Sequence, residues 1–296
     1  MKLGSEIFRI QLWTGSYPMV YCRIAALIFI LTCGSIAPAL EFAERRPTAS
    51  RRAEWAERAQ QAYERIIAAQ TEPLATTAEE VIERCIAAMG GREVLASLRT
   101  LSMTSTGYMV GGRFGGTRLL KAPNFIRQER NGGLFVVTDG IRAWRVEGDD
   151  WEPLPPGQSM WQQVFNITLD LVDYEAKNVT YNFVGNEALE GGAFYKLRKT
   201  ISTGKEIFVY FDIGTGLLTM EEEFGENGRM INLFFDHREV GGVLLPHMRV
   251  RLADVLDTAH VALLSYEANP ALDDALFEPQ IAAESDDPSV EGGLQP

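Results

Sequence analysis

Two glycine-rich stretches are the first places where this sequence could do chemistry. Gly90 and Gly91 stand just before the helical pattern "REVLAS", and backbone N–H groups at such a position can cradle a phosphate. However, no lysine or hydroxyl follows at phosphate-binding spacing. The four glycines of "MVGGRFGGTR" precede a strand-like segment instead of a helix. We therefore expect the first stretch to end one helix and turn the chain, and the second to form a hairpin turn.

Acidic and histidine side chains give no recognisable catalytic or metal-binding pattern. The carboxylates in "MEEEFGE" alternate along a predicted strand beside a turn, which is typical of a solvated strand end. The histidines, His237, His247 and His260, stand far apart, each inside a strand pattern. HExxH, GxSxG and GxxxxGK[ST] are absent. The sequence thus predicts no cofactor, no metal ion and no catalytic residue. One enzymatic hypothesis is kept beside the two non-catalytic ones given below: an enzyme that acts on an envelope lipid through Glu221 and Glu223.

The N-terminal 39 residues read as a secretory signal. In "RIAALIFILTCGSIAPA" an arginine precedes an uncharged run, which ends in the A-x-A pattern of a cleavage site. The run is short for a membrane span, which needs about 20 residues. Met19 is a more ordinary first residue for such a signal than Met1, because the polar stretch before it is long. Two alternatives stay open, a lipid anchor at Cys33 and an uncleaved anchor helix. Each of these readings places the rest of the chain outside the cytosol, and we expect it in the periplasm.

Composition and net charge limit the kinds of molecule that the chain is expected to bind. The chain has 296 residues, 46% of them apolar, which is enough for a large core. Cleavage after Ala39 removes Lys2, Glu6, Arg9 and Arg23 and leaves 25 basic and 39 acidic side chains, a net charge of −14. That charge opposes binding to nucleic acid. Cys85 is the one cysteine beyond the signal, at a spacing that predicts packing in the core.

Three longer helices are expected, besides the short one in "REVLAS" after the glycine pair. Residues 51–70 carry apolar side chains at three- and four-residue spacing, and 40–74 as a whole read as a spacer followed by this amphipathic helix. A second helix begins at Thr77, with Glu80 completing a capping box, and ends at the glycine pair. The third is expected within 158–172, where the apolar residues suit a helical face.

From Arg99 onward the hydrophobic period changes to two, and short strand-like segments alternate with turns. There is no βαβ alternation, so a nucleotide-binding doubly wound fold is not expected. In "FDIGTGLL", Asp212 is placed to hydrogen-bond the amides of a tight turn. In "LLPHMRVRL", alternate residues are apolar, and the arginines fall on the other face. Residues 281–296 form an acidic tail that is expected to be disordered.

Four segments together resemble the outer-membrane lipoprotein-sorting family, the LolA-like proteins. They are "AMGGREVLASLRTLSMTSTG", "YFDIGTGLLTMEE", "EVGGVLLPHMRV" and "NPALDDALFEP", and the resemblance covers residues 75–280. It implies an α+β, mostly β fold: a single antiparallel sheet of about eleven strands, curled into a half-open barrel whose concave face is capped by helices. It also implies a non-catalytic protein of the periplasm. In the lipoprotein carrier of that family, an arginine on an early strand holds the helices that cover the cavity. Arg113, Arg118 and Arg127 are the candidates for that role in this sequence.

On this resemblance, the leading hypothesis is a carrier that buries acyl chains of a lipid or lipoprotein. Each methylene removed from water contributes about 0.8 kcal/mol. The alternative is an envelope protein on the same fold that binds another protein or senses stress. The expected lining of the cavity comprises Met103, Trp144, Ile207, Val209, Phe211, Met220, Ile231, Leu233, Phe235, Met248 and Val250 on the sheet, and Trp161, Phe165 and Ile167 on the middle helix.

Overall fold

A computed structural model describes residues 57, 61, 64, 67–68, 73–109, 112–131, 133–139, 141–155, 171–189, 192–225, 228–253 and 258–279. The predicted signal peptide, most of the spacer and first helix, residues 158–170 of the third helix and the acidic tail lie outside these residues. Helices with assigned bounds are α5 (Ala78–Ala88), α6 (Arg92–Ser97) and the 3-10 helices η3 (Glu175–Lys177) and η4 (Asp274–Phe277).

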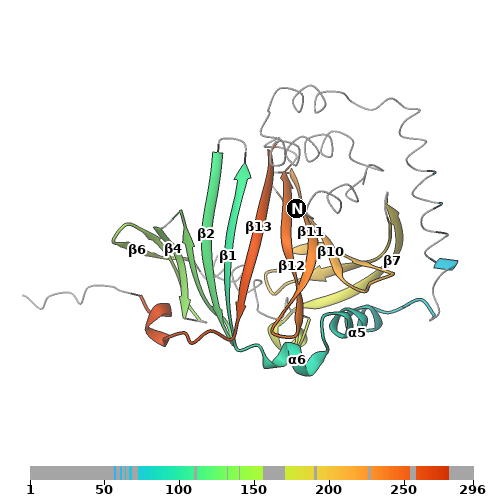
Figure 1. Cartoon of the computed structure of the whole chain (residues 1–296), viewed down its shortest axis with the longest axis horizontal. Coiled ribbons are helices and arrows are strands. Elements are labelled where there is room, and N and C mark those ends of the chain that lie inside the picture. The colour runs from blue at the N-terminus through green and yellow to red at the C-terminus, as the bar shows by residue number, and fades with distance from the viewer. Residues whose placement is uncertain are drawn as a thin grey trace, which may run out of the picture.

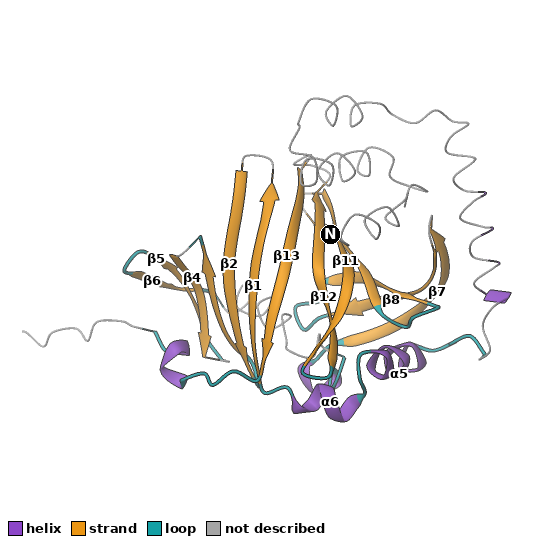
Figure 2. Ribbon diagram, viewed as in Figure 1, coloured by secondary structure: helices purple, strands orange, loops and turns teal. Residues whose placement is uncertain are grey.

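The strands form one antiparallel sheet in the order β6-β5-β4-β3-β2-β1-β13-β12-β11-β10-β9-β8-β7, as Figures 1 and 2 show. Every neighbour in the sheet is also a neighbour in sequence except β1 and β13, so two meanders join at that pair. The sheet is not closed, because β6 and β7 are its edges. The strands are β1 (Thr100–Met109), β2 (Gly112–Lys121), β3 (Phe125–Arg130), β4 (Gly133–Asp139), β5 (Ala143–Glu147), β6 (Asp150–Pro153), β7 (Thr180–Leu189), β8 (Gly192–Thr200), β9 (Glu206–Asp212), β10 (Leu218–Gly225), β11 (Gly228–Val240), β12 (Val243–Ala253) and β13 (Thr258–Ala268).

The predicted fold class is confirmed, with 13 strands in place of about eleven. One hydrophobic cluster shows which way the sheet curves. It contains buried residues of α5, of β1 to β3 at one side of the sheet and of β8 and β9 at the other. Strands so far apart in the sheet can share one cluster only if the sheet bends around α5. We call this side the concave face; its cluster includes Val81, Ile82, Cys85, Leu101, Leu120, Ile126, Tyr195, Leu197 and Val209.

Helix α5 begins where the sequence predicts. The Thr77 side chain accepts a hydrogen bond from the Glu80 backbone N–H at 3.2 Å, and the Glu80 carboxylate accepts from the Thr77 N–H at 3.2 Å. This capping box satisfies donors that the first helical turn leaves unpaired. The helix is fixed to β8 by Tyr195, whose hydroxyl accepts from Arg84 and from the Ala75 N–H, each at 3.2 Å.

The glycine pair after α5 has a structural reason. A side-chain carbon at Gly90 would stand 2.2 Å from the Gly242 carbonyl oxygen in the β11–β12 turn, so this backbone approach admits only glycine. The Leu244 N–H also donates to the Met89 carbonyl at 3.0 Å. Gly90 and Gly91 thus end one helix against the sheet, as expected from the sequence.

The predicted turn in "FDIGTGLL" is also confirmed. The Asp212 carboxylate accepts from the Thr215 N–H at 2.7 Å, and Gly216 takes a positive φ of 75°. A side-chain carbon at Gly216 would stand 3.1 Å from the Arg84 carbonyl oxygen of α5. This turn therefore packs closely under the helix.

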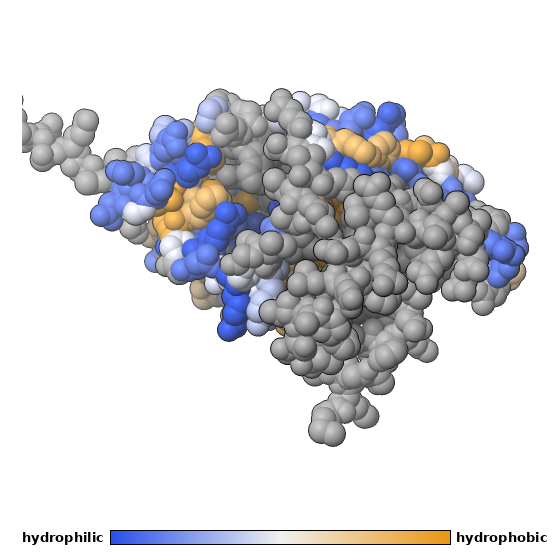
Figure 3. Space-filling model, turned by 90° about the horizontal axis from the view of Figure 1, so that it is seen from above, coloured by the Kyte–Doolittle hydropathy of each residue, from blue (hydrophilic) through white to orange (hydrophobic). Residues whose placement is uncertain are grey.

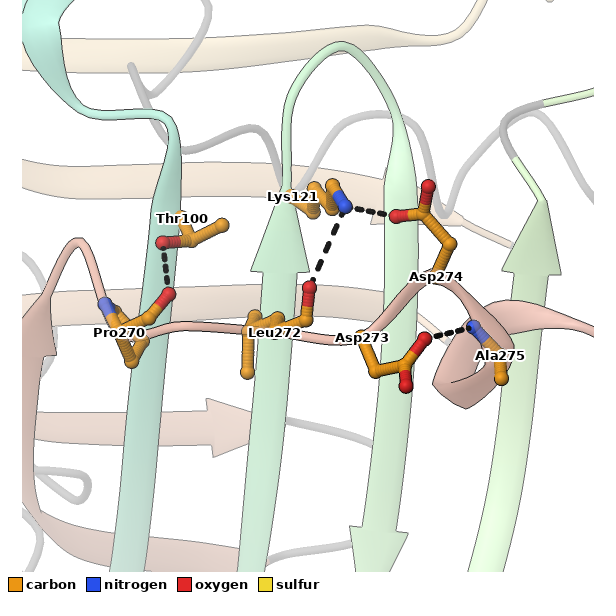
Figure 4. A network of polar contacts seen from close by, with 7 residues as sticks. All are labelled: Thr100, Lys121, Pro270, Leu272, Asp273, Asp274 and Ala275. Carbon is orange, nitrogen blue, oxygen red and sulfur yellow. Dashed lines mark hydrogen bonds and ion pairs between the residues drawn. The ribbon is translucent and has the colours of Figure 1, made fainter.

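The opposite face of the sheet carries a second cluster, centred on β9 to β13. Its buried members are Phe194, Tyr210, Met220, Ile231, Leu233, Val250, Leu252 and Val261. This face is also crossed by the segment that follows β13. Figure 4 shows the segment running over β1 and β2, where the Thr100 hydroxyl donates to the Pro270 carbonyl at 2.7 Å. The segment ends in η4, which contacts β3 and β4.

Candidate functional site

The predicted lining residues do not share one surface, and the register shows why. Ile207, Val209 and Phe211 belong to the cluster on the concave face. Met103 lies on that face too, two residues beyond Leu101 on β1 and opposite Tyr266 of β13. These four residues thus lie on the face of the sheet that α5 packs against. Whether they contact a ligand stays a prediction.

The other sheet residues of the set point away from α5. Met220 pairs with Leu233, Leu233 with Val250 and Phe235 with Met248, and directly paired side chains point to the same face. All of these, with Ile231, belong to or pack against the second cluster on the opposite face. The expectation of a single lining is thus wrong for the set as a whole. The cause is a bulge between Leu218 and Met220, which resets the alternation of β10 against β9.

Trp144 lies on a third patch. It pairs with Val137, which in turn pairs with Arg127, so all three side chains point to the face that η4 covers. The Arg142 guanidinium stands 5.1 Å from the centre of the Trp144 ring. Trp161, Phe165 and Ile167 lie outside the described residues.

The centre of the concave face carries arginines that the predicted lining did not include. Pairing of β2 with β3 places Arg118 and Arg130 on the same face as Met103. Arg249 and Arg251 alternate with Val250, which belongs to the opposite cluster, so their side chains point to the concave face. The alternation in "LLPHMRVRL" was the signal in the sequence. It correctly separated the two faces of β12, but gave no means of telling which face was concave.

These arginines lie close enough to influence one another. Burial, followed by the positive charges of Arg249 and Arg130, lowers the pKa of Arg118 to about 10. Burial and the charge of Arg251 lower the pKa of Arg249, whereas Glu221 acts in the opposite direction. Tyr266 lies within the field of both Arg118 and Arg249. Its hydroxyl donates to the Pro246 carbonyl at 2.8 Å, which holds the ring against β12.

Of the three arginines that the resemblance brought forward, only Arg118 points to the concave face. Its Nη2 donates to the Gln128 side-chain oxygen at 3.0 Å. Arg127 points to the opposite face, where it binds Glu129 and the Leu276 carbonyl. Arg113 is exposed and stands over the Tyr108 ring at 5.6 Å.

The carboxylates of β10 are divided by the strand's alternation. Glu221 and Glu223 point to the concave face, and Glu223 pairs with Lys205 at 2.5 Å. Glu222 points to the opposite face, where it is buried beside Arg229 and accepts a hydrogen bond from Tyr210. Within the described part of the chain, no three histidine, cysteine or acidic side chains are placed to hold a metal ion.

The other sequence features lie as follows. Cys85 is fully buried on the face of α5 that packs against the sheet, as predicted, and burial raises the pKa of its thiol to about 12. In the described residues no helix is long and apolar enough to span a membrane. Figure 3 looks onto the end of the sheet away from α5 and α6, where hydrophobic and hydrophilic residues adjoin on the visible surface.

Comparison with known proteins defines the class of the fold. No family model matches the sequence, and no curated protein matches it. A LolA superfamily protein from Nitrosomonas europaea superposes with a TM-score of 0.52 at 12% identity, over 69% of this chain and 98% of that chain. A DUF1329 family protein from Desulfovibrio piger follows at 0.46 and 10% identity, over 68% of this chain and 96% of its own. A domain assigned to outer membrane lipoprotein sorting, from Vibrio parahaemolyticus, superposes with a TM-score of 0.48 at 9% identity, over 67% of this chain and 95% of that chain.

The first of these likenesses shows that the chain has the fold of the LolA superfamily. The resemblance drawn from the four sequence segments is thereby confirmed at the level of the fold. The structure also explains why those segments carried it. Three of them supply the glycines and turns that hold α5 and α6 against the sheet, and the fourth follows β13 across the opposite face.

Proposed function

We propose that this protein is a periplasmic, non-catalytic carrier that buries acyl chains of a lipid or lipoprotein on the concave face of its open sheet. The observation that carries the proposal is the unclosed sheet that bends around α5. Apolar side chains continue beyond the buried cluster on this face, because Met103, Phe234 and Tyr266 are only half-buried. An acyl chain laid on them leaves water at about 0.8 kcal/mol per methylene.

The LolA-superfamily fold supports this proposal, and so does the secretory signal that residues 23–39 predict. The pairs of neighbouring groups on the concave face also favour binding over catalysis. The carboxylate of Glu223 is engaged by Lys205, and that of Glu221 acts on Arg249. Release of a chain needs only that the binding energy stays modest, since association itself costs several kcal/mol.

The first test is the lipid content of the protein. The full chain is produced with its own signal in a Gram-negative host, purified without detergent and examined by native mass spectrometry and lipid extraction. We expect a bound species with the mass of an acyl lipid. Met103→Glu places a charge on the concave face and is expected to abolish that species. Leu263→Glu is the matched control, because Leu263 is 54% exposed on the opposite face of neighbouring β13.

A lipid-free wild-type protein that also fails to bind added monoacyl lipid would overturn the carrier function. In that case the envelope protein-interaction alternative explains the same fold. Equal loss of lipid in the two variants would show that the charge acts through general destabilisation. Their thermal midpoints, measured in parallel, separate these outcomes.

A further inference from the structure

The strongest charged feature of the concave face is its group of guanidinium groups. Arg118 and Arg130 come from β2 and β3, and Arg249 and Arg251 from β12, on the far side of β1 and β13. The chain as a whole has a net charge of −12, so positive charge is concentrated here against the overall balance. A concave surface on which one sign of charge predominates attracts a ligand of the other sign.

Among the described residues, two acidic side chains of β10 act on the arginines of β12. On the concave face Glu221 acts on Arg249, and Glu223 acts on Arg251 while pairing with Lys205. Within the described residues the half-buried Arg249 guanidinium makes no hydrogen bond or ion pair. A guanidinium held beside other guanidinium groups without such a partner is destabilising for the protein alone, which is typical of a site whose partner is a ligand.

The surroundings of this group define what it fits. Met103 lies between Arg118 and Tyr266 across β2, β1 and β13, so apolar surface adjoins the charges directly. Tyr266 closes the other side against β12. Each guanidinium offers five donors, and two of them together exceed what one carboxylate can accept, whereas a phosphate monoester presents three acceptor oxygens.

We infer that Arg118 and Arg249 form a subsite for the phosphate group of an acyl-bearing ligand, with the acyl chain lying on the adjoining apolar surface. This inference rests on the proposed carrier function and names its ligand class, an acyl-bearing phosphate monoester such as phosphatidate or lysophosphatidate. Arg251 and Arg130 contribute long-range attraction from either side. The phosphate replaces the missing partner of Arg249.

The test compares two ligands with the same acyl chain. Myristoyl lysophosphatidate carries a phosphate, and monomyristoylglycerol does not. By calorimetric titration of the full chain at low ionic strength, we expect the phosphate-bearing lipid to bind at least about tenfold more tightly, the value of one charge-assisted hydrogen-bonded contact. Arg249→Gln is expected to remove most of this difference and to leave the affinity for the neutral lipid unchanged. Arg238→Gln removes the same charge from an exposed site on β11, paired with Asp236, and serves as the matched control.

Thermal unfolding midpoints provide a second measurement, which separates a ligand-binding role of Arg249 from a purely structural one. A residue that serves only the fold would lower the midpoint when replaced, whereas Arg249→Gln is expected to leave it unchanged or raise it, because repulsion from Arg118 and Arg251 is relieved. Inorganic phosphate alone distinguishes a free anion from a head group. Weak binding of phosphate by the wild type, lost in Arg249→Gln, supports the subsite even where no acyl ligand binds.

Three results would overturn the inference. They are equal affinity of the wild type for the two lipids, equal loss of both lipids in Arg249→Gln, and phosphate binding that Arg249→Gln leaves intact. Equal affinity for both lipids removes the phosphate subsite and keeps the carrier function. Absence of binding by either lipid removes the carrier function itself, so the two failures are distinguishable.

Discussion

Glu222 shows how the environment decides the role of a side chain at the scale of single residues. Its two neighbours in sequence face the concave side, but its own carboxylate is buried on the opposite face with Arg229 and Tyr210. The side chains of Arg229 and Glu222 are only 9% and 6% exposed, so neither charge is well solvated. Desolvation of two charges makes such a pair nearly neutral for stability as a unit, although breaking it is costly.

Glu222→Gln is therefore expected to destabilise the protein by about 3 kcal/mol, because the buried Arg229 guanidinium loses the carboxylate of this pair. The measurement is the free energy of unfolding in urea. Glu206→Gln is the control, since its pair with Arg198 at 3.7 Å is about half exposed and contributes at most about 1 kcal/mol.

The double variant Glu222→Gln with Arg229→Met refines this prediction. It removes the stranded charge, so stability should return toward that of the wild type. If Glu222→Gln alone costs no more than Glu206→Gln, the buried pair does not have the role that its position indicates.

At the scale of elements, the junction between α5 and α6 depends on two neighbouring glycines for different reasons. Both take positive φ, 120° at Gly90 and 96° at Gly91, which costs any other residue backbone strain. Only Gly90 has a neighbour within reach, the Gly242 carbonyl, whereas a side-chain carbon at Gly91 would meet nothing within 4 Å. The pair therefore offers a comparison in which strain is shared and the steric contact is not.

Gly91→Ala is expected to cost about 1–3 kcal/mol of unfolding free energy from backbone strain. Gly90→Ala should cost at least about 2 kcal/mol more, because overpacking against the β11–β12 turn is added. Urea unfolding of the two variants measures the difference. Equal costs would mean that the helix and the turn separate easily, and that the close approach of Gly90 to Gly242 does not hold α5 in place.

Local features of this kind were predictable from the sequence, and features of register were not. The capping box at Thr77 and the Asp212 turn involve residues within four positions of each other, so the types and spacing were sufficient. Which residues line the concave face depends on the residues of β10 that pair with the concave-facing residues of β9. Because "IFVYF" is apolar on both faces, and the bulge before Met220 changes the alternation, no residue pattern indicates that choice.

The site was predictable to the same extent. The sequence separated Arg249 and Arg251 from Val250 by strict alternation, as the structure shows. Which side faces α5 follows only from the pairing of distant strands, because β1 joins β13 across nearly the whole described chain. For this reason the alternation alone favours the apolar face of β12 as the lining of the cavity, whereas the structure places the arginines of the other face there.

At the scale of the whole molecule, the segment after β13 ties the two meanders together. It leaves the middle of the sheet and crosses β1 and β2, where Lys121 contacts Asp274 and the Leu272 carbonyl (Figure 4). It then places Phe277 against Phe125 of β3, with ring centres 5.6 Å apart. Phe277 is fully buried, so the segment is part of the core on this face.

Phe277→Ala is expected to cost about 3–5 kcal/mol of unfolding free energy, as for other large aromatic side chains removed from a core. Leu276→Ala is the control. Leu276 is only half-buried, and its backbone carbonyl keeps the bond from Arg127 at 3.2 Å, so its loss should cost about 1 kcal/mol. Hydrogen exchange of β3 and β4 amides adds a spatial reading. Because η4 covers these strands, Phe277→Ala should weaken their protection more than that of β8 and β9, which pack against α5. A uniform loss of protection across the sheet would instead show that the whole sheet opens as one cooperative unit, with no separate contribution from the segment after β13.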